Sequence, residues 1–568
     1  MSRSTLPSRR RDWTVPAALA AADEGSAGFT FAREDGTEQP WPLTRLRERA
    51  REVAAALRER GLAAGGRVAL ALPEPERFVP ALLGVMWAGG VPVPLYPPTT
   101  PGSLDGYLAT ARQIVAAACA SHLVAGGSSV GMLAPLADGP PRPAILDYAR
   151  LDGDAEHAPA PPTDPDTVAL LQFTSGSTEQ PKGVVLTYRN IAANCRAIMV
   201  DGLRVRAGDR GVSWLPLFHD MGLIGFVLAP ILHRQPVTLL PPRAFVRNPA
   251  IWLKTISRHR GTVTFAPNFA YALAARRLHE GELAALDLSC LRVAGCGAEP
   301  IQAETLRAFA RRFAAAGFRA EAFRPSYGLA ESTLAVSLGR GIPVDRIDRA
   351  ALAEGRAEPV ADGCALELVG CGRPFPGHAL RIVDPATGRA LPERSVGEIL
   401  VRGPSVMARY VGDTAATAEA RVGPWLRTGD LGYLADRQLF VCGRRKDLIV
   451  VSGRKYAPQD VEWAAGEVDG VRAGSLVAFA LPADGGERER VVVVAEVRRR
   501  AAADQVTADI RRAVHRALAL PVDQVVLVEP GALPKTSSGK LRRASTRALY
   551  LSGALGQRRP AGAAGGDR

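Results

Sequence analysis

The spacing of apolar residues near the N-terminus predicts alternating helices and strands. Apolar positions recur at helical intervals over residues 42–60, and Gly61 follows as a C-cap in left-handed backbone, so we expect an amphipathic helix here. Residues 68–72 are typical of a buried strand, residues 78–87 of a helix and residues 91–95 of an extended segment. This alternation predicts an α/β sheet.

The apolar pattern changes toward the C-terminal part of the chain. Residues 380–410 form short alternating runs separated by Gly and Pro, which predicts a small β subdomain. We therefore expect an α/β fold: a large N-terminal body of two α/β sheet subdomains plus this small β subdomain, followed by a small mobile α+β domain. The expected boundaries are a body at 1–442, a hinge at 443–446, a C-terminal lid domain at 447–555 and a disordered tail at 556–568.

Composition predicts a soluble globular enzyme. The 568 residues exceed what one hydrophobic core usually supports, and 47% of them are hydrophobic while 23% are charged. The apolar runs are shorter than a membrane span, so we expect no stable insertion into a membrane. The Arg-rich start runs on without an apolar segment, which argues against a secretory signal and predicts a cytoplasmic protein.

The net charge and the cysteines narrow the possible partners. A formal charge of +14 is compatible with nucleic acid, an anionic nucleotide or an acidic protein. The arginines alternate with glutamates in helical segments, and no basic run is interleaved with stacking aromatics, so we expect no nucleic-acid binding. The seven cysteines include no C-x-x-C pair, which argues against a zinc site and a disulfide framework.

The most informative stretch is a loop rich in glycine and hydroxyl residues. It follows the apolar strand 168–172, and residues 173–183 read Phe-Thr-Ser-Gly-Ser-Thr-Glu-Gln-Pro-Lys-Gly. Hydroxyl donors, backbone N–H groups beside a glycine and the point charge of Lys182 suit a polyphosphate. The P-loop pattern G-x-x-x-x-G-K-[ST] is absent, so we expect a nucleotide loop of another kind. The alternative is a plain surface turn.

Three further stretches would complete a nucleotide site. Residues 291–300 and 324–332 contain glycines and follow strand-like runs, and ligands of α/β sheets bind at the carboxyl ends of strands. They supply a purine-sized slot, an aromatic face and the carboxylate of Glu331, which suits magnesium. Asp430 stands in a tight turn and can accept both hydroxyls of a ribose. Each stretch alone is also compatible with an ordinary turn before a helix.

Other candidate residues are less distinctive by themselves. His219 lies in a mostly apolar segment, 213–223, and a single histidine there is also compatible with a core or helix-capping role. Apolar stretches at 225–240 and 263–268 predict either the lining of a pocket for an aliphatic substrate or plain core. Lys540 lies in a Gly-Ser loop that is too distinctive for a merely solvated lysine.

These motifs, in this order across nearly the whole chain, resemble the adenylate-forming superfamily of acyl-CoA synthetases, peptide-synthetase adenylation domains and luciferases. The resemblance implies ATP and Mg²⁺ as cofactors, with Glu331 as the magnesium ligand. It implies His219 between the acyl and nucleotide sites, Lys446 as the hinge and Lys540 as a catalytic lysine from the small domain. The implied nucleotide-binding residues are Thr174, Ser175, Gly176, Ser177, Thr178, Lys182, Gly297, Ala298, Glu299, Tyr327, Gly328, Asp430 and Arg444.

The chemistry implied by the resemblance gives these residues a physical purpose. A carboxylate is a poor acylating agent, so it attacks the α-phosphorus of ATP, pyrophosphate leaves, and the mixed anhydride then acylates a nucleophile. Charge that builds on the phosphoryl oxygens would meet Lys540, Mg²⁺ and the hydroxyl loop. Because the lysine must leave before a bulky thiol enters, a small domain that rotates on a hinge would serve both half-reactions.

Within the superfamily, the chain looks most like the fatty acyl-AMP ligases, which pass acyl-adenylates to the phosphopantetheine thiol of an acyl carrier protein. The interval after Glu331 is long, and that family has an insertion here that disfavours free CoA. Residues 344–352 lie in this interval, and their alternative interpretation is an ordinary surface loop and helix. The strings that carry the resemblance are 214–222, 325–331, 456–460 and 533–540.

Two positions bear on related families. Phe218-His219-Asp220 stands where amino-acid adenylation domains carry an acidic anchor for the amine, which disfavours an amino-acid substrate. Tyr188 stands where the family usually has a histidine after the strand that follows the loop, which affects one local contact rather than the chemistry.

The expected function is activation of a medium or long-chain fatty acid to acyl-AMP with release of pyrophosphate. The acyl group would then load an acyl carrier protein, or a carrier domain of a polyketide or peptide synthase, and the positive net charge would suit an acidic carrier. The alternatives are an acyl-CoA synthetase that uses ATP and CoA, and a non-catalytic nucleotide or lipid sensor. The presence of Glu331, Asp430 and Lys540 argues against the sensor.

Overall fold

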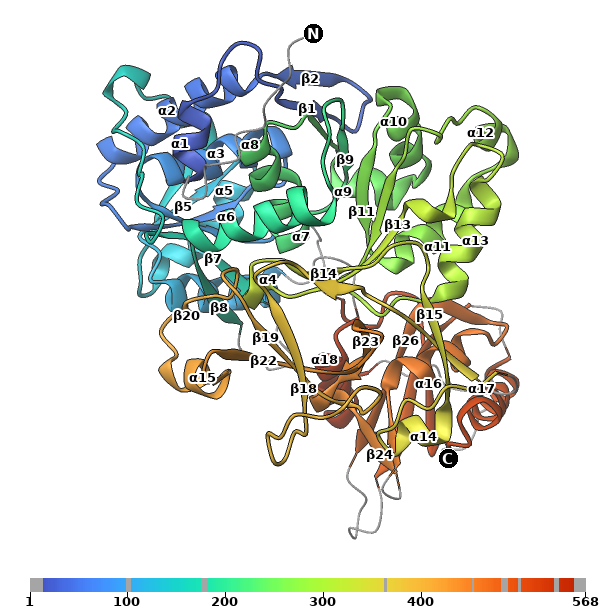
Figure 1. The fold of residues 1–568 in the computed structure, drawn as a ribbon. Helices are drawn as coiled ribbons and strands as arrows, with labels where there is room; N and C mark the ends of the chain where they lie inside the picture. Colours follow the sequence, from blue (N-terminus) through green and yellow to red (C-terminus); the bar gives the residue numbers. More distant parts are fainter. Residues whose placement is uncertain are drawn as a thin grey trace, which may run out of the picture.

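The protein, seen in a computed structural model, has the expected α/β fold, with a large body of sheets and helices and a smaller α+β domain at the C-terminal end (Figure 1). Among the helices of the described ranges, none is both long and apolar enough to cross a membrane. The structure describes residues 14–98, 104–174, 181–361, 365–451, 454–481, 489–498, 502–535 and 541–555.

The largest sheet has nine strands in the order β17-β14-β13-β12-β11-β9-β10-β1-β2. Pairing is parallel from β13 through β1, so the carboxyl ends of β9 to β13 lie at one edge. The strands are β1 (Phe29–Ala32), β2 (Glu38–Trp41), β9 (Gly211–Ser213), β10 (Val237–Leu239), β11 (Val263–Ala266), β12 (Val293–Cys296), β13 (Phe323–Gly328), β14 (Ala335–Leu338) and β17 (Arg373–Pro374).

The two faces of this sheet pack against different helices. Thr264 of β11 accepts a hydrogen bond from the indole N–H of Trp252 at 2.9 Å, which places helix α10 on one face. The next side chain, Phe265, points to the opposite face and contacts Phe226 with ring centroids 6.4 Å apart. The helices concerned are α10 (Ala250–His259), α11 (Asn268–Arg277) and α13 (Ala303–Phe313), and on the face of Phe226 the π-helical segments η4 (Ala197–Gly202) and η5 (Ile224–Leu228).

The second sheet of the body and the helices that accompany it are the elements predicted near the N-terminus. Its four parallel strands follow the order β4-β3-β5-β6. The predicted helix 42–60 is confirmed as α2, and Gly61 has the left-handed φ of +85° expected after its end. The elements are α2 (Leu43–Glu59), β3 (Arg67–Ala71), α3 (Pro75–Trp87), β4 (Val91–Pro94), α4 (Leu104–Ala118), β5 (His122–Ala125) and β6 (Ala144–Asp147).

A three-stranded sheet holds the two flanks of the hydroxyl-rich loop. Strands β7 (Val168–Thr174) and β8 (Lys182–Thr187) are antiparallel, and the register pairs Thr174 with Lys182. The third strand is β20 (Arg409–Tyr410), which pairs with β8. The expectation that residues up to 410 belong to the small β subdomain is therefore wrong at this strand, because its backbone partner is β8.

The small β subdomain is otherwise present and extends beyond its predicted limits. Strands β18, β19, β22 and β21 form a sheet, and β23 pairs with β22. Residues after Glu331 form a separate hairpin of β15 and β16 with helix α14 between them. The bounds are β15 (Val344–Asp348), α14 (Arg349–Ala353), β16 (Ala365–Val369), β18 (Ala379–Val383), β19 (Gly397–Arg402), β21 (Arg421–Val422), β22 (Trp425–Ala435) and β23 (Gln438–Arg444).

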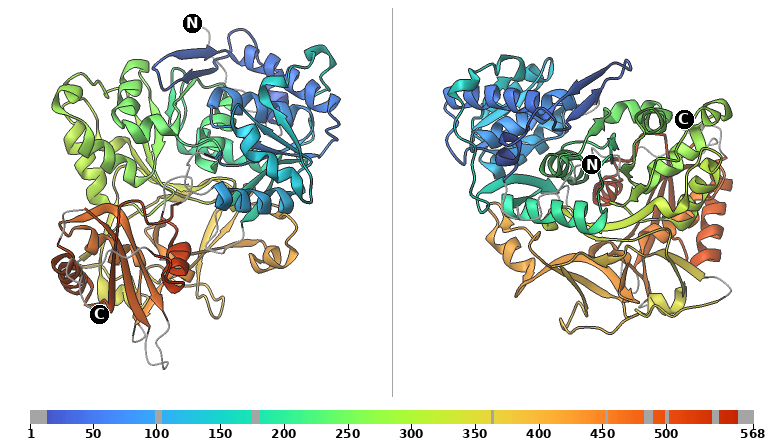
Figure 2. Two further views of the ribbon diagram at one scale, coloured as in Figure 1. Left: turned by 180° about the vertical axis from the view of Figure 1, so that it is seen from behind. Right: turned by 45° about the horizontal axis from the view of Figure 1, so that its top comes forward.

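The C-terminal domain is a three-stranded sheet with helices on both faces; Figure 2 shows it in orange and red. Alternate residues of β26 belong to two apolar clusters: Leu476 and Ala478 face α16 and α17, while Val477 and Phe479 face α18. The exact domain boundaries stay a prediction. The elements are α16 (Pro458–Gly466), β26 (Val471–Leu481), β27 (Arg490–Val497), α17 (Ala503–Leu518), β28 (Gln524–Val528) and α18 (Arg543–Leu551).

A half-buried arginine ties this domain together. Arg543 bonds Asp447 at 2.9 Å, Glu462 at 2.7 Å and the carbonyl of Ala478 at 2.9 Å. In R543M the two carboxylates would face each other without a cation, so we expect the domain to lose about 2 kcal/mol of stability. Hydrogen exchange measured by mass spectrometry should then be roughly thirty-fold faster in α16 and β26.

The matched control for this prediction is R512M. Arg512 pairs with Asp509 on the exposed side of α17, where ion pairs contribute little. We expect exchange in R512M to stay within about two-fold of the unsubstituted protein. Equal protection of α16 and β26 in both variants would contradict the role assigned to Arg543.

Candidate active site

The candidate ribose and adenine residues meet at one buried carboxylate. The hydroxyl of Tyr327 donates to Asp430 Oδ2 at 2.8 Å, and Arg444 Nε donates to Asp430 Oδ1 at 3.1 Å. Burial raises the pKa of Asp430, whereas the charge of Arg444 and the bond from Tyr327 lower it. The structure therefore brings together three residues that sequence analysis assigned to the nucleotide from separate motifs.

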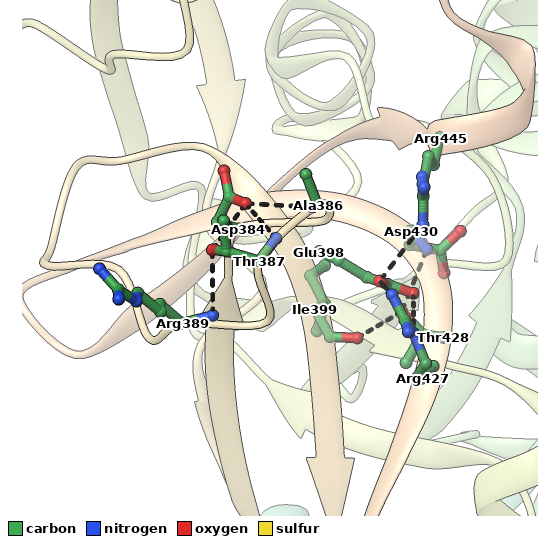
Figure 3. A network of polar contacts seen from close by, with 10 residues as sticks. All are labelled: Asp384, Ala386, Thr387, Arg389, Glu398, Ile399, Arg427, Thr428, Asp430 and Arg445. Carbon is green, nitrogen blue, oxygen red and sulfur yellow. Dashed lines mark hydrogen bonds and ion pairs between the residues drawn. The ribbon is translucent and has the colours of Figure 1, made fainter. Parts of the chain in front are cut away.

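The pairing register of two adjacent strands brings the carboxylate of Asp430 and the guanidinium of Arg444 together. Asp430 of β22 lies directly opposite Arg444 of β23, and the left-handed Gly429, with φ of +73°, precedes the acid. In the same sheet, Glu398 of β19 accepts three hydrogen bonds from Arg427, the shortest at 2.6 Å, and lies 3.8 Å from Arg445 (Figure 3). This ion-pair network binds β19 to β22.

The predicted hinge, Lys446, lies where the bonding partners change from the body to the C-terminal domain. Before it, Arg444 and Arg445 pair with carboxylates of β22 and β19. After it, Asp447 pairs with Arg543 of α18. The residue predicted to rotate is thus flanked by one contact set on each side.

The candidate magnesium ligand lies beside the flank of the hydroxyl-rich loop. Tyr410 donates its hydroxyl to Glu331 Oε1 at 2.8 Å, and the Nζ atom of Lys182 is 5.1 Å from the centroid of the Tyr410 ring. Burial raises the pKa of Glu331, and the bond from Tyr410 lowers it. Thr174 and Lys182 are paired neighbours, while Ser175, Gly176, Ser177 and Thr178 lie outside the described residues.

Tyr410 is a site residue that no sequence motif predicts. The residue occupies a two-residue strand, and only the pairing of β20 with β8 brings its ring between Glu331 and Lys182. No local motif marks it. The only feature of the sequence that could have pointed to it is a tyrosine at the end of a short, partly apolar segment.

The candidate adenine segment follows β12, next to the end of β13. Gly297 lies so close to Ser326 that an added Cβ would be 2.4 Å from its Oγ. Ala298 has a left-handed φ of +69°, an unusual conformation for alanine. Glu299 accepts a hydrogen bond from the backbone N–H of Phe269 at 2.7 Å, so its carboxylate also caps the start of α11.

His219 lies at the start of the short helix α7 (Asp220–Leu223), whose Leu223 N–H donates to the His219 carbonyl at 2.8 Å. Its ring contacts Phe218, with centroids 4.9 Å apart. The side-chain amide of Gln172 donates to the Phe218 carbonyl at 2.9 Å, while its Oε1 atom is buried and has no hydrogen-bond partner among the described residues. In the sequence, Gln172 is part of an otherwise apolar strand, and nothing nearby marks it as functional.

An apolar pocket opens beside the candidate nucleotide-binding residues. Gly328 and Tyr327 line it together with Ala298, next to the nucleotide candidates. The stretches 225–240 and 263–268 contribute in part: some residues line the pocket, whereas Val227, Leu228 and Ile231 are core. The lining residues from these two stretches are Gly225, Phe226, Pro230, Gln235, Val237, Val263 and Phe265.

A second, larger cleft lies between the body and the C-terminal domain. Tyr327, Asp430 and Arg444 line it from the body, and Lys535 and Leu541 line it from the C-terminal domain. Lys540 lies outside the described residues. The described residues nearest to it in the sequence on each side, Lys535 and Leu541, form an antiparallel bridge, and both line this cleft.

The chain is similar to several known enzymes over most of its length. The AMP-binding enzyme family matches residues 31–411. A putative acyl-CoA synthetase of Caulobacter vibrioides is 39% identical, over 96% of this chain and 96% of its own. The long-chain-fatty-acid–AMP ligase FadD26 of Mycobacterium marinum is 37% identical, over 86% of this chain and 88% of its own.

A solved structure shows the same fold. It comes from structural and functional studies of fatty acyl-adenylate ligases from E. coli and L. pneumophila, and it matches with a TM-score of 0.90 and 37% identity. The match covers 96% of this chain and 99% of the other. The expected fold and the expected family resemblance are both confirmed by these findings.

The bond between Tyr410 and Glu331 predicts a pH effect. Y410F removes a hydrogen bond that favours the ionised carboxylate, so the pKa of Glu331 should rise. Because a carboxylate holds Mg²⁺ only when it is ionised, the acid limb of kcat/KM for pyrophosphate release should move to higher pH, and Y410F should lose relatively more activity at pH 6 than at pH 8.

The control is Y433F, which removes a bond of the same length, 2.8 Å, from Tyr433 to Asp345 outside the site. Its pH profile should overlay that of the unsubstituted protein. A Y410F profile that is lower at every pH by one constant factor would count against the assigned link between Tyr410 and Glu331.

Proposed function

The chain belongs to the AMP-binding enzyme family as a fatty acyl-AMP ligase, and from this premise we propose that it activates a medium or long-chain fatty acid and passes it to an acyl carrier protein. The observation that carries the proposal is the apolar pocket that opens at Tyr327 and Gly328, beside the Asp430 group. The carboxyl group of an aliphatic acid in this pocket would meet a nucleotide that is bound in the cleft.

We assign the nucleoside to the residues around Asp430. Tyr327 would stack on the adenine, Gly297, Ala298 and Glu299 would form its edge, and Gly328 would approach it through backbone. Asp430 and Arg444 would hold the ribose hydroxyls. Support for this assignment comes from their common location: with the exception of Gly297, all of them line the cleft between body and C-terminal domain.

We assign the phosphates to the loop 174–182. Thr174 and Lys182 are held at its two flanks, and Ser175, Gly176, Ser177 and Thr178 would supply the donors between them. Mg²⁺ suits this place, because a single buried carboxylate, Glu331, lies beside the loop and Mg²⁺ is usually held by one or two carboxylates plus substrate phosphates. When bound, it would neutralise charge on the phosphates.

The reaction follows from these positions. His219 would lie between the acyl and nucleotide sites, since the next residues, Asp220 and Met221, line the apolar pocket. The fatty-acid carboxylate would attack the α-phosphorus of ATP; the bond to pyrophosphate breaks, and pyrophosphate leaves with the electron pair. Lys540 would donate to the oxygens that gain charge in this step. The thiol of the carrier would then attack the acyl carbonyl and release AMP.

The hairpin after Glu331 supports a carrier protein over free CoA as acceptor. Asp345 of β15 accepts bonds from Tyr433 at 2.8 Å and Arg394 at 2.9 Å, which fixes the hairpin on the body. At its other end, Arg349 of α14 lies close enough to Asp460 of α16 to lower the pKa of that carboxyl, which burial raises to about 7. The hairpin thus bridges the body and the C-terminal domain, and it would restrict the rotation that free CoA requires.

The first experiment incubates the protein with ATP, Mg²⁺ and fatty acids of increasing length, and follows acyl-AMP, with CoA or a holo carrier protein supplied separately. Acyl-AMP that persists with CoA and is consumed by the carrier is the expected outcome. Rapid formation of acyl-CoA would favour the second candidate, an acyl-CoA synthetase, which the description of the Caulobacter relative suggests.

Lys540 provides a direct test of the chemistry. In K540A we expect acyl-AMP formation to fall by about a hundred-fold or more, because the charge that develops on the α-phosphate loses its cation. The control is K535A, since Lys535 lines the same cleft and bonds Ser475 Oγ at 3.4 Å. K535A should stay within about three-fold, and undiminished adenylation in K540A would refute the assignment.

The bridge between the hairpin and α16 predicts a change of acceptor. Deleting residues 341–357 would remove Ile347 and Ala357, which are fully buried, so a substitution is the cleaner test. R349E should loosen the contact with Asp460 and raise CoA-dependent AMP release several-fold, with acyl-AMP formation unchanged.

The control for this substitution is R356E. Arg356 follows α14 and pairs with Glu354 and Glu358 on the exposed side of the hairpin. It should leave CoA use unchanged. If R349E and R356E use CoA at the same low rate as the unsubstituted protein, the hairpin does not restrict the acceptor.

A further inference from the structure

The apolar pocket has a second end, at the opposite edge of the large sheet from the nucleotide candidates. Ala298 and Gly328, at the carboxyl ends of β12 and β13, line its first end. Its second end is lined by the first residues of three neighbouring strands, and their register places them side by side. These residues are Gly211 of β9, Val237 of β10 and Val263 of β11. The pocket therefore follows the strands from one edge of the sheet to the other.

The length of the strands sets the length of acyl chain that spans the pocket. At the far end Thr264 of β11 pairs with Ala294 of β12, which pairs with Phe323, the first residue of β13, and Gly328 lies five residues further along the same strand. Five steps of extended backbone cover roughly 16 Å. An extended alkyl chain advances about 1.25 Å per carbon, so a chain of about 12 carbons would reach from one edge to the other.

The far end of the pocket is polar, unlike its middle. Asp209, Arg210 and Gln235 line it there, next to the apolar Val205 and Pro230. Arg210 is exposed and Gln235 is partly exposed, so this end reaches solvent. A chain that spans the pocket would bring its terminal group to these three side chains.

Asp209 and Arg210, the two charged residues at this end, differ in whether protein groups compensate their charge. Asp209 is buried; it accepts hydrogen bonds from the N–H of Arg206 at 2.7 Å and from Thr262 at 2.8 Å, and it forms a bidentate ion pair with Arg292. Its charge is therefore compensated. In contrast, no hydrogen bond or ion pair within the described ranges engages the guanidinium of Arg210. The uncompensated charge at the far end is positive.

We propose that Arg210 makes this enzyme select acyl chains that carry a carboxylate at the end opposite the reacting one, namely α,ω-dicarboxylic acids of about 12 carbons. The proposal rests on the proposed function and specifies its substrate class. A carboxylate is costly in an apolar pocket unless a cation meets it, and Arg offers a geometry that fits carboxylates. Shorter diacids would leave their second charge among the apolar residues of the pocket, and so they would bind poorly.

The test compares four acids of the same length in pyrophosphate release: dodecanoic, 12-hydroxydodecanoic, dodecanedioic and 12-aminododecanoic acid. For the unsubstituted protein we expect kcat/KM to be about five-fold higher with dodecanedioic than with dodecanoic acid, as fits a charge-assisted contact near solvent. The amino acid should be the poorest substrate of the four. A dicarboxylate with eight carbons should lose this advantage.

Two substitutions assign the effect to Arg210. R210Q should equalise dodecanedioic and dodecanoic acid, and R210E should reverse the order of the dicarboxylate and the amino acid. The control is R206Q, since Arg206 is exposed nearby and does not line the pocket. R206Q should keep the preference for the dicarboxylate.

The outcomes separate this inference from the proposed function. If dodecanoic acid is adenylated but R210Q and R210E alter all four acids equally, or none, the inference is overturned and the proposed function stands. If the unsubstituted protein adenylates no acid of any length while it binds ATP, the proposed function fails and the inference fails with it.

Discussion

The carboxylate of Asp430 joins three parts of the molecule. One oxygen accepts from Tyr327 at the end of the large sheet, and the other accepts from Arg444 at the end of β23. A carboxylate buried to this degree is costly without partners, so the two donors hold the large sheet, the small β subdomain and the approach to the C-terminal domain in one arrangement. The candidate adenine and ribose residues owe their common location to this group.

The chain passes from the body to the C-terminal domain between two sets of ion pairs. Arg444 and Arg445 are bound to the body, whereas Asp447 is bound to Arg543 within the domain, so the chain changes sides at Lys446. Elsewhere the two parts enclose a cleft rather than a shared apolar core, because the apolar clusters of the C-terminal sheet contain residues of that domain alone. This division suits a small domain that changes position between two half-reactions.

The sequence by itself determined the fold class, several elements and the family. The period of residues 42–60 and the glycine after them predicted helix α2, because an amphipathic pattern and a C-cap are both encoded within one segment. The order of the glycine-rich motifs led to the adenylate-forming enzymes, which the match over residues 31–411 confirmed. The roles of single residues, including Lys540 and the loop serines outside the described ranges, stay predictions.

Tertiary structure alone decided which distant residues share a site. Tyr410 was expected in the small β subdomain, but it belongs to a strand beside β8 and bonds Glu331, 79 residues earlier in the chain. Similarly, the apolar stretch 225–240 was compatible with core or pocket; Phe226 lines the pocket and Val227 beside it is core. A hydrophobic period states that one face is covered, not what covers it. Strand pairing and sheet packing supply that answer, because they depend on contacts between residues far apart in the chain.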